Sequence, residues 1–411
     1  MRYRFGVVCT AGQGAASRLW VCGSRAELGA WEPRGATELA ESSTRRGGED
    51  SPREPRLYWG DVEMGGEEGE EEVERVEGEE EVVRGEEEEE RKTPLEFSYK
   101  FIKTEESAPG QVVWEGCGPA HNRRSLTAEE LAEALVDGVV CLPIGHWIEE
   151  GGHTDEWRHT TNFYLNIAQR HAMHYSRVLP RLWLGSCPRV PSHVSATLRV
   201  ALGATAIVNL QTAEDVEANS GACAPATCGY AGTAPQRLQE LCRREGIAYV
   251  WLPTADMCTE GRTQVLPQAA WILHGLLAGG HSVYVHCNAG VGRAAAAVAG
   301  YLCHVLGWAP RRAHYHLAAQ RPAVYLDHEA LGRAAPDFRR KFGAALVLSA
   351  EEAAWARGRT GGGGGEGGGG GGGHEGAEEP GQGSPVDLVG RPPDPFRGFE
   401  KRGGARTELG A

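Results

Sequence analysis

The chain has 411 residues, with 42 Lys and Arg against 56 Asp and Glu, which gives a formal net charge of −14. Residues 61–91 hold 17 acidic and 3 basic residues, so this one block carries the whole imbalance. The remainder is neutral, which argues against a nucleic-acid-binding protein, because such proteins present a basic face. No apolar run approaches the roughly 18 residues of a membrane-spanning helix.

The composition favours a soluble, intracellular and cytoplasmic protein with about two folded domains. The 11 cysteines are scattered without a C-x-x-C pair, which predicts free thiols in a reducing compartment. The N-terminus lacks the apolar stretch of a secretory signal. We expect the acidic residues 65–91 to form a disordered loop and the Gly-rich residues 346–411 to form a disordered tail.

Residues 1–125 have the pattern of an all-β domain. Short runs rich in Val, Tyr, Trp and Phe alternate with Gly, Pro and charged clusters; they span 3–8, 19–22, 57–62, 97–102 and 112–114. This texture predicts a small β-sandwich or barrel. The acidic block falls between the third and fourth runs, so it is interpreted as a loop insertion, and residues 126–174 are interpreted as an interdomain segment.

From residue 175 to 345 the pattern changes to alternating strands and helices. Apolar runs at 206–210, 247–252 and 282–286 are typical of strands that are buried on both faces. One helix, with Pro267 in its first turn, is expected between the last two runs and ends at Gly279, and a second helix is expected at 294–306. This order predicts a parallel or mixed sheet flanked by helices.

The most informative stretch follows the run at 282–286 and opens the next helix. It reads His286, Cys287, Asn288, Ala289, Gly290, Val291, Gly292 and Arg293. Small residues allow successive backbone N–H groups to converge on an anion, and the helix N-terminus adds positive potential. A cysteine at the base of this cradle should be stabilised as a thiolate, and Arg293 can bind two phosphate oxygens. The pattern predicts phosphoryl transfer through a cysteinyl phosphate.

This chemistry requires an acid that protonates the leaving oxygen. Asp256 comes just after the run at 247–252, so we expect it at the same sheet edge as Cys287. An ordinary loop or cap aspartate is the alternative interpretation of this position. No cofactor and no metal are expected, because the cysteinyl mechanism needs neither.

The stretch 286–293 resembles the signature loop of cysteine-dependent phosphatases of the dual-specificity class, in the form found in glucan phosphatases. The resemblance implies an α/β phosphatase fold with Cys287 as nucleophile, Arg293 as phosphate binder and Asp256 as acid. It also implies that Met257, Tyr325 and Phe342 lie near a glucan channel. Where the family has Ser or Thr after the arginine, this chain has Ala294, which predicts slower hydrolysis of the phosphoenzyme.

Two tryptophans stand out in the N-terminal region. Sugar sites combine aromatic platforms with a few polar groups, and here Trp31 and Trp114 could supply the platforms and Lys100 and Asn122 the polar contacts. The order of these residues resembles a starch-binding module of carbohydrate-binding family 20. Ser98 stands where that family places a further Trp. Packing in the hydrophobic core is the alternative role for any single Trp.

A carbohydrate-binding module followed by a phosphatase domain resembles the glucan phosphatases of glycogen metabolism. The resemblance implies glycogen and phosphorylated glucans as ligands and substrates, homodimerisation, and contacts with the ubiquitin ligase malin and with glycogen-targeting subunits of protein phosphatase. It also implies association with glycogen and with the periphery of the endoplasmic reticulum membrane. Composition and spacing alone support none of these partners.

Three alternatives remain open from the residues. The chain could be a catalytically weak scaffold bound to glycogen, which Ala294 keeps in consideration, or a dual-specificity protein phosphatase. A metal site could be built from histidines, namely His146, His153, His159, His171 and His174. These histidines lack the helical H-x3-H spacing of a zinc site, so the interpretation as surface or interface residues is favoured.

Overall fold

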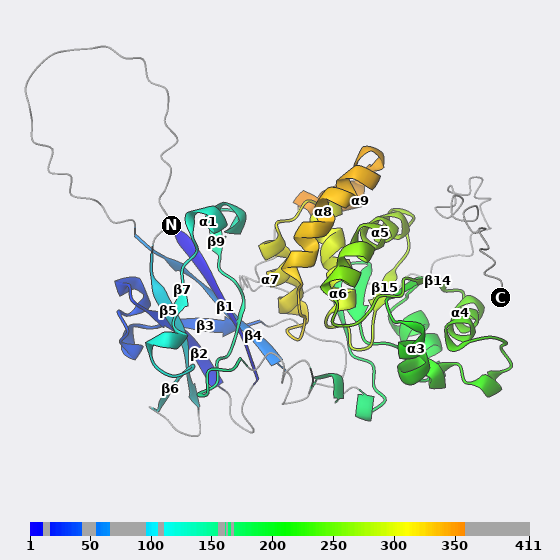
Figure 1. The fold of residues 1–411 in the computed structure, drawn as a ribbon, viewed down its shortest axis with the longest axis horizontal. Helices are drawn as coiled ribbons and strands as arrows, with labels where there is room; N and C mark the ends of the chain where they lie inside the picture. The colour runs from blue at the N-terminus through cyan, green and yellow to red at the C-terminus, as the bar shows by residue number, and fades with distance from the viewer. Residues whose placement is uncertain are drawn as a thin grey trace, which may run out of the picture.

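The structure is a computed structural model of the chain, and it describes residues 1–10, 17–42, 55–65, 96–105, 111–154, 161, 163–165 and 168–357. An N-terminal sheet of ten strands lies next to a C-terminal sheet of five strands that is flanked by helices (Figure 1). Nearly all of the acidic block and the Gly-rich tail from residue 358 lie outside the described residues, so the predictions made for them are not addressed by the structure.

The N-terminal sheet has the order β6-β5-β2-β3-β4-β1-β9-β8, with β10 beside β1 and β7 beside β5. Its strands are β1 (Arg2–Thr10), β2 (Ser17–Gly23), β3 (Thr37–Glu41), β4 (Pro55–Glu63), β5 (Ser98–Glu105), β6 (Val112–Trp114), β7 (Arg123–Arg124), β8 (Leu135–Val136), β9 (Val139–Cys141) and β10 (Gly145–His146). All five predicted runs are strands. The predictions missed β3, whose residues are mostly exposed and mostly polar.

A buried aromatic cluster forms the core beneath these strands. Tyr3, Phe5 and Phe97 pack with Tyr99 and Phe101, all at most 5 % exposed, and several ring pairs meet edge to face. Burying such rings is the main stabilising contribution of a small β-domain. The alternating inward positions of β1 and β5 supply this core, which explains why their sequence pattern could be identified.

The N-terminal sheet does not end near residue 125, where the predicted boundary lies. Strands β9 and β10 pair in parallel with β1, and the short helix α1 (Ala128–Ala134) precedes β8. The beginning of the predicted interdomain segment therefore completes this sheet. These strands are two or three residues long, so they carry too little periodicity to be identified from sequence.

The C-terminal sheet has the order β11-β12-β15-β13-β14, in which only β11 is antiparallel to its neighbour. Its strands are β11 (Tyr175–Leu179), β12 (Leu182–Gly185), β13 (Ala206–Asn209), β14 (Ala248–Trp251) and β15 (Val283–His286). The helices are α3 (Ala213–Ser220), α4 (Ala234–Arg244), α5 (Thr259–Ala278), α6 (Arg293–Gly300), α7 (Pro310–Gln320) and α8 (His328–Phe342), with π-type segments η4 (His193–Ala201) and η7 (Tyr301–Val305). The carboxyl ends of the four parallel strands meet at one edge.

Helix α5 begins earlier than predicted. It starts at Thr259, where the Cys258 sulfur accepts a hydrogen bond from the Gly261 N–H, so Pro267 lies inside the helix rather than in its first turn. The apolar face from Leu266 onward was visible in the sequence. The first two turns were not, because they carry polar residues.

The folded chain also extends beyond the predicted boundary at 345. Helix α9 (Ala350–Arg357) is held in place by Glu352, which is 0 % exposed. The Glu352 carboxylate accepts a hydrogen bond from the Tyr301 hydroxyl, and its Oε1 lies 2.7 Å from His274 Nδ1. The start of the tail at 346 was therefore placed too early. The sequence of α9 is rich in Ala and charged residues, so it gives no sign that the carboxylate of Glu352 is buried and anchors the helix.

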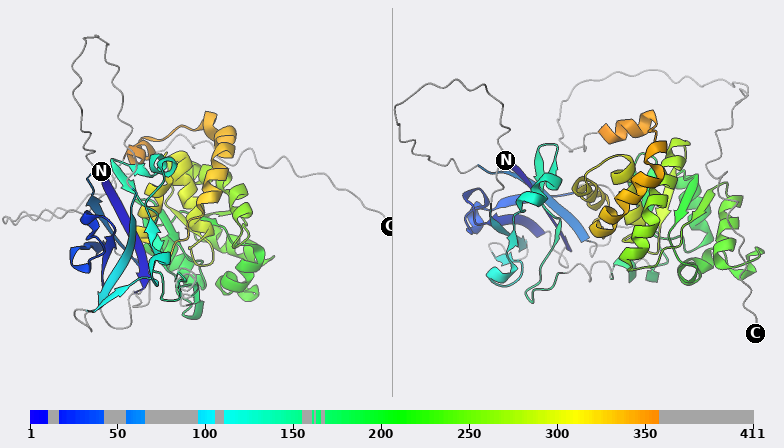
Figure 2. Two further views of the ribbon diagram at one scale, coloured as in Figure 1. Left: turned by 60° about the vertical axis from the view of Figure 1, so that its left-hand side comes forward. Right: turned by 45° about the horizontal axis from the view of Figure 1, so that its top comes forward.

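Helix α7 joins the two sheets. The Tyr315 hydroxyl donates hydrogen bonds to the backbone carbonyls of Arg4, at 3.3 Å, and Leu142, at 3.1 Å. A Cβ atom at Gly6 would lie 2.8 Å from the Tyr315 ring, so only glycine allows β1 to approach this closely. Figure 2 shows α7 between the N-terminal strands and the rest of the C-terminal part.

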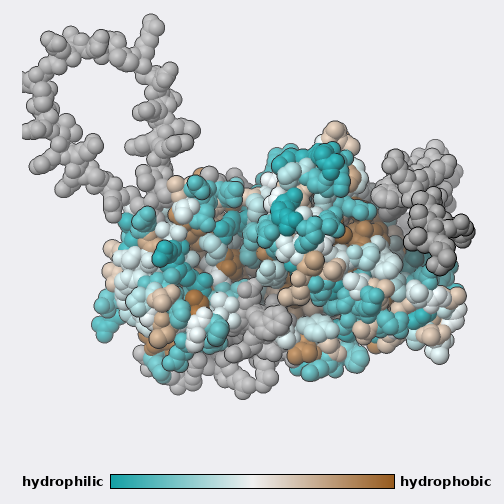
Figure 3. All heavy atoms as spheres, viewed as in Figure 1, coloured by the Kyte–Doolittle hydropathy of each residue, from teal (hydrophilic) through white to brown (hydrophobic). Residues whose placement is uncertain are grey.

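The described surface in Figure 3 is largely hydrophilic, with small apolar patches. Among the described helices, none combines the length and apolar character needed to cross a membrane.

Candidate active site

The loop at 287–293, called the phosphate loop below, connects β15 to α6 at the middle of the sheet edge. Cys287 is 4 % exposed and lies at the base of this loop. Gly290 has φ +68°, and a Cβ atom there would lie 2.3 Å from the Gly185 carbonyl oxygen. Any side chain at this position would displace the loop, which explains the glycine that the sequence presents.

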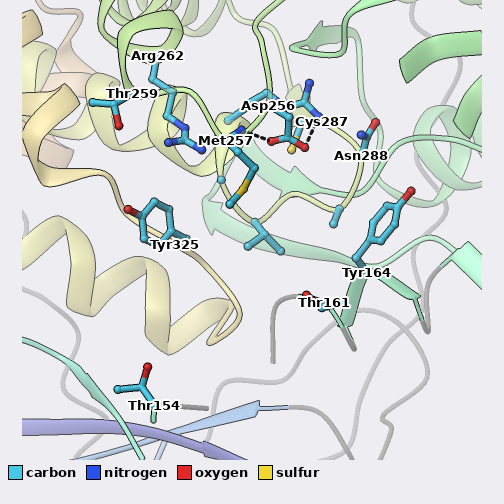
Figure 4. A pocket seen from close by; sticks show the side chains of 14 residues that line it. Thr154, Thr161, Tyr164, Asp256, Met257, Thr259, Arg262, Cys287, Asn288 and Tyr325 are labelled. Carbon is cyan, nitrogen blue, oxygen red and sulfur yellow. Dashed lines mark hydrogen bonds and ion pairs between the residues drawn. The ribbon is translucent and has the colours of Figure 1, made fainter. Parts of the chain in front are cut away.

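Arg293 begins α6 and is 2 % exposed. Its Nη1 donates to Asp215 Oδ2 at 2.5 Å and to the Thr254 carbonyl at 3.0 Å, and its Nη2 donates to Asp256 Oδ2 at 3.0 Å. The structure therefore brings Arg293 and Asp256 together at the mouth of the cavity that Cys287 also lines. Figure 4 shows Asp256 beside Cys287, at the sheet edge where the sequence predicted both residues.

Asp215 was not identified from the sequence. It follows β13 and accepts hydrogen bonds from Arg293 and, at 2.7 Å, from Asn288 Nδ2. Burial raises the pKa of Asp215, but the hydrogen bonds from Asn288 and Arg293 outweigh it, so the pKa lies below its usual value. The available signal was a capping box, since Thr212 and Asp215 cap α3 reciprocally directly after a buried strand.

Gln211, which was not identified from the sequence either, holds the side-chain amide of Asn288 in the phosphate loop. Gln211 is 0 % exposed, and its Nε2 donates to Asn288 Oδ1 at 2.8 Å. The side chain of Asn288 is thus oriented at both ends, by Gln211 and by Asp215. A buried amide with both groups satisfied keeps a single rotamer.

Arg321 supports the phosphate loop from the side opposite the cavity and was not identified from the sequence. It is 1 % exposed, and its guanidinium donates to the carbonyls of Ala289 and Gly290. Its Nη1 lies 2.7 Å from His174 Nδ1, which must accept because an arginine can only donate. With these carbonyls directed toward Arg321, the N–H groups of the loop are free to face the cavity.

His286 precedes Cys287 and is fully buried. Burial lowers the pKa of His286 to about 4, because the charged imidazolium has no solvent there. Its Nδ1 lies 3.3 Å from the Cys287 carbonyl. The ring is neutral at physiological pH and packs beneath the loop as an uncharged group.

A cavity of about 670 Å³ opens above Cys287. Its lining residues are Thr154, Thr161, Tyr164, Asp256, Met257, Thr259, Arg262, Cys287, Asn288, Ala289, Val291, Gly292, Arg293 and Tyr325. Met257 and Tyr325 are 74 % and 41 % exposed, and both project at its rim. Phe342 does not line it; it stacks on Trp271 with ring centroids 5.0 Å apart.

Ala294 follows Arg293 and is 0 % exposed, in contact with the core of the C-terminal part. The position lies within the first turn of α6, beside the phosphate loop. A methyl group there offers no hydrogen bond to the loop. The departure noted in the sequence thus lies in the buried core, directly after the phosphate loop.

The predicted sugar-contact residues lie on the N-terminal sheet. The rings of Trp31 and Trp114 are side by side, with centroids 6.3 Å apart. Trp31 has φ +67° and Ala30 has φ +48°, a strained turn of the kind that is retained at functional sites. Both indoles are partly exposed, so core packing does not account for either one.

The two predicted polar contacts differ in exposure: Lys100 is buried, whereas Asn122 is partly exposed. Lys100 is 5 % exposed, and its Nζ donates to the carbonyls of Glu115, at 3.2 Å, and Gly118, at 2.8 Å. Lys100 therefore braces the loop after Trp114. Asn122 is partly exposed and ends the short helix η3 (Pro119–His121).

Within the described part of the chain, no three His, Cys, Asp or Glu side chains come close enough together to hold a metal ion. His159, which belonged to the alternative metal site, lies outside the described residues. Of the same group, His174 is instead engaged by Arg321. The four described histidines of this group therefore do not form a metal-binding cluster.

Comparison with known proteins identifies the C-terminal part. Residues 228–331 match the family model of the dual specificity phosphatase catalytic domain. Laforin from Mus musculus is 47 % identical over 351 residues, covering 84 % of this chain and 97 % of that protein. Among solved structures, PTPMT1 is similar over 42 % of this chain and 97 % of its own (22 % identity, TM-score 0.32), and human DUSP28 over 41 % and 95 % (18 % identity, TM-score 0.29).

The family model confirms the dual-specificity phosphatase fold predicted for the C-terminal part. The protein is a cysteine-dependent phosphatase of that class and a glucan phosphatase. An identity of 47 % over nearly the whole of mouse laforin extends the relationship to the N-terminal part as well. The chain belongs to the laforin family.

Proposed function

We propose that this chain binds glycogen through its N-terminal sheet and removes phosphate monoesters from it at Cys287. The observation that carries the proposal is the convergence of Arg293 and Asp256 at the mouth of the cavity that has Cys287 at its base. A nucleophile, a phosphate-binding guanidinium and an acid are the three groups that this chemistry needs.

In the first step, the Cys287 thiolate attacks phosphorus and the bond from phosphorus to the sugar oxygen breaks. Asp256 gives its proton to that oxygen, so the glucan leaves as an alcohol. In the second step, Asp256 takes a proton from water, which attacks phosphorus and releases inorganic phosphate and the thiolate. Arg293 and the N–H groups of residues 288–292 stabilise the phosphoryl charge throughout.

The N-terminal part is proposed to be a β-sandwich carbohydrate-binding module of family 20. Supporting observations are the paired rings of Trp31 and Trp114 and the strained turn that presents Trp31. Asn122 lies on the loop braced by Lys100 and supplies a polar contact for sugar hydroxyls. Met257 and Tyr325 extend the glucan contacts to the rim of the phosphatase cavity.

Further assignments follow from the family. We propose that the enzyme acts in glycogen metabolism in association with glycogen, with homodimerisation and with contacts to malin and to glycogen-targeting subunits of protein phosphatase. We also propose that the protein is located at the periphery of the endoplasmic reticulum membrane. Co-precipitation with each named protein, with and without added glycogen, tests them individually.

The experiment for the catalytic proposal is phosphate release from phosphorylated amylopectin, detected with malachite green. Wild type should release phosphate in proportion to time. Cys287→Ser should release none above background while still co-sedimenting with glycogen. Equal release by Cys287→Ser and wild type would refute the proposed nucleophile.

A second candidate function, that of a glycogen-bound scaffold with weak turnover, is favoured by Ala294. This methyl group stands where a hydroxyl could stabilise the departing thiolate, so the phosphoenzyme should hydrolyse slowly. Ala294→Ser tests it: a burst of one phosphate per site followed by a stall in wild type, relieved in the variant, favours the scaffold. Steady release by both proteins favours the phosphatase.

A further inference from the structure

Arg262, on the first turn of α5, is a second cation in the wall of the cavity. It is 4 % exposed, and its Nη1 donates to Asp327 Oδ2 at 2.9 Å. Figure 4 shows Arg262 and Tyr325 on one side of the cavity and Tyr164 on the other. The mechanism above gives Arg262 no role, although a buried guanidinium is costly to retain.

Asp327 holds Arg262 in one orientation. Asp327 caps α8 by accepting a hydrogen bond from the Ala330 N–H at 2.9 Å, and Thr259 Oγ1 donates to its Oδ2, also at 2.9 Å. Burial raises the pKa of Asp327, but these hydrogen bonds and the one from Arg262 bring it below its usual value. The carboxylate therefore stays ionised, and the ion pair is charge-balanced and immobile.

The other terminal nitrogen of Arg262 faces the cavity. A Cβ atom at Gly292 would lie 3.3 Å from Nη2, so this nitrogen is next to the phosphate loop. The guanidinium carbon is 5.6 Å from the centroid of the Tyr325 ring. No described residue accepts a hydrogen bond from Nη2, so an oriented donor stands between the loop and an exposed aromatic ring.

We infer that Arg262 Nη2 donates a hydrogen bond to an oxygen of the glucosyl unit that carries the phosphate. Tyr325 covers the apolar face of the same sugar. Because Asp327 balances the charge of Arg262, this residue adds directional recognition of the leaving group rather than attraction for the phosphate dianion. The inference rests on the proposed glucan phosphatase function and makes Arg262 a specificity-determining residue.

The discriminating experiment compares two substrates that share the phosphate but differ in the leaving group. For Arg262→Met, kcat/KM on phosphorylated amylopectin should fall by roughly 10- to 100-fold, the worth of one charge-assisted hydrogen bond. On para-nitrophenyl phosphate it should change less than about 3-fold, within the usual effect of a neutral substitution. Arg333→Met, on the surface of α8, is the matched control and should change neither value.

Removing Arg262 alone leaves Asp327 buried without its partner, so the double variant R262M/D327N is included. Thermal unfolding and inhibition by tungstate verify that each variant retains the fold and the phosphate cradle. Equal loss on both substrates would overturn the inference, as would unchanged activity on amylopectin. Wild type that hydrolyses para-nitrophenyl phosphate but not phosphorylated amylopectin would instead overturn the proposed function.

Discussion

The guanidinium of Arg321 lies beneath the phosphate loop, where its Nε donates to the Gly290 carbonyl oxygen at 2.7 Å. Arg321 directly follows α7, the helix whose Tyr315 contacts the N-terminal strands. Helix α7 therefore contacts the N-terminal sheet through Tyr315, and the residue that follows its last turn, Arg321, supports the phosphate loop. The same segment, α7 with Arg321, thus supports the phosphate loop and packs the C-terminal part against the N-terminal sheet.

Replacing Arg321 by Met should release this support. The loop carbonyls would lose their donors and the N–H groups would no longer converge, which should lower kcat/KM on para-nitrophenyl phosphate by about 100-fold. Co-sedimentation with glycogen should be unchanged. Arg244→Met on the surface of α4 is the control, and equal activity of the two variants would contradict the supporting role.

Asp215→Asn should weaken the hold on Arg293 and Asn288 without changing the size of the side chain. We expect kcat/KM on para-nitrophenyl phosphate to fall by about 10- to 100-fold, because one charge-assisted hydrogen bond is lost. Because the pKa of Asp215 lies below its usual value, the carboxylate is ionised from pH 5 to 7 and the ratio of wild type to variant should stay constant there. A ratio that collapses to one at pH 5 would be inconsistent with this account. Asp337→Asn is the control.

His286 should make the unfolding free energy fall in mild acid. Its pKa is about 4 when folded against an ordinary value of 6.5, so the unfolded chain binds the proton more readily below pH 6.5. Linkage gives a loss of about 2 kcal/mol between pH 7 and pH 5, with further loss down to about pH 4. Urea unfolding at both pH values should show a smaller loss for His286→Gln. An identical pH dependence in the two proteins would argue that His286 is not the titrating group.

Trp31→Ala and Trp114→Ala should each weaken glycogen binding by about 10-fold or more, equivalent to roughly 1.4 kcal/mol of lost stacking. Hydrolysis of para-nitrophenyl phosphate should persist in both variants. Trp355→Ala, a partly buried tryptophan on α9 of the C-terminal part, serves as the control. Wild-type binding by the Trp31 and Trp114 variants would show that glycogen binds elsewhere.

Much of this architecture was accessible from the sequence, for reasons that differ along the chain. The apolar runs before Asp256 and Cys287 predicted parallel strands, and their shared edge predicted the approach of both residues to one another. The predicted burial on both faces is correct for β15 but wrong for β14, which is an edge strand with partly exposed residues. The strands β8 to β10 and the helix α9 were missed because tertiary contacts hold them. The pairing of β9 with β1 and the buried carboxylate of Glu352 are examples.

The residues missed at the site have a common property. Gln211, Asp215 and Arg321 contact the phosphate loop with side chains from other elements, at sequence distances that no local motif encodes. Arg262 likewise lines the cavity from the distant helix α5. Only Asp215 carried a local signal, in its capping box. Phe342 was placed near the cavity by resemblance, whereas the structure stacks it on Trp271.

We propose that Cys287 carries out the hydrolysis of glucan phosphate. Single-turnover quench of the wild-type enzyme with phosphorylated amylopectin tests it most directly, with Cys287→Ser and Asp256→Asn alongside. We expect one phosphoryl group per site to be trapped on Cys287 after acid quench, none in Cys287→Ser, and slower formation in Asp256→Asn. Phosphate release by Cys287→Ser at the wild-type rate, with no phosphoenzyme in either protein, would contradict it.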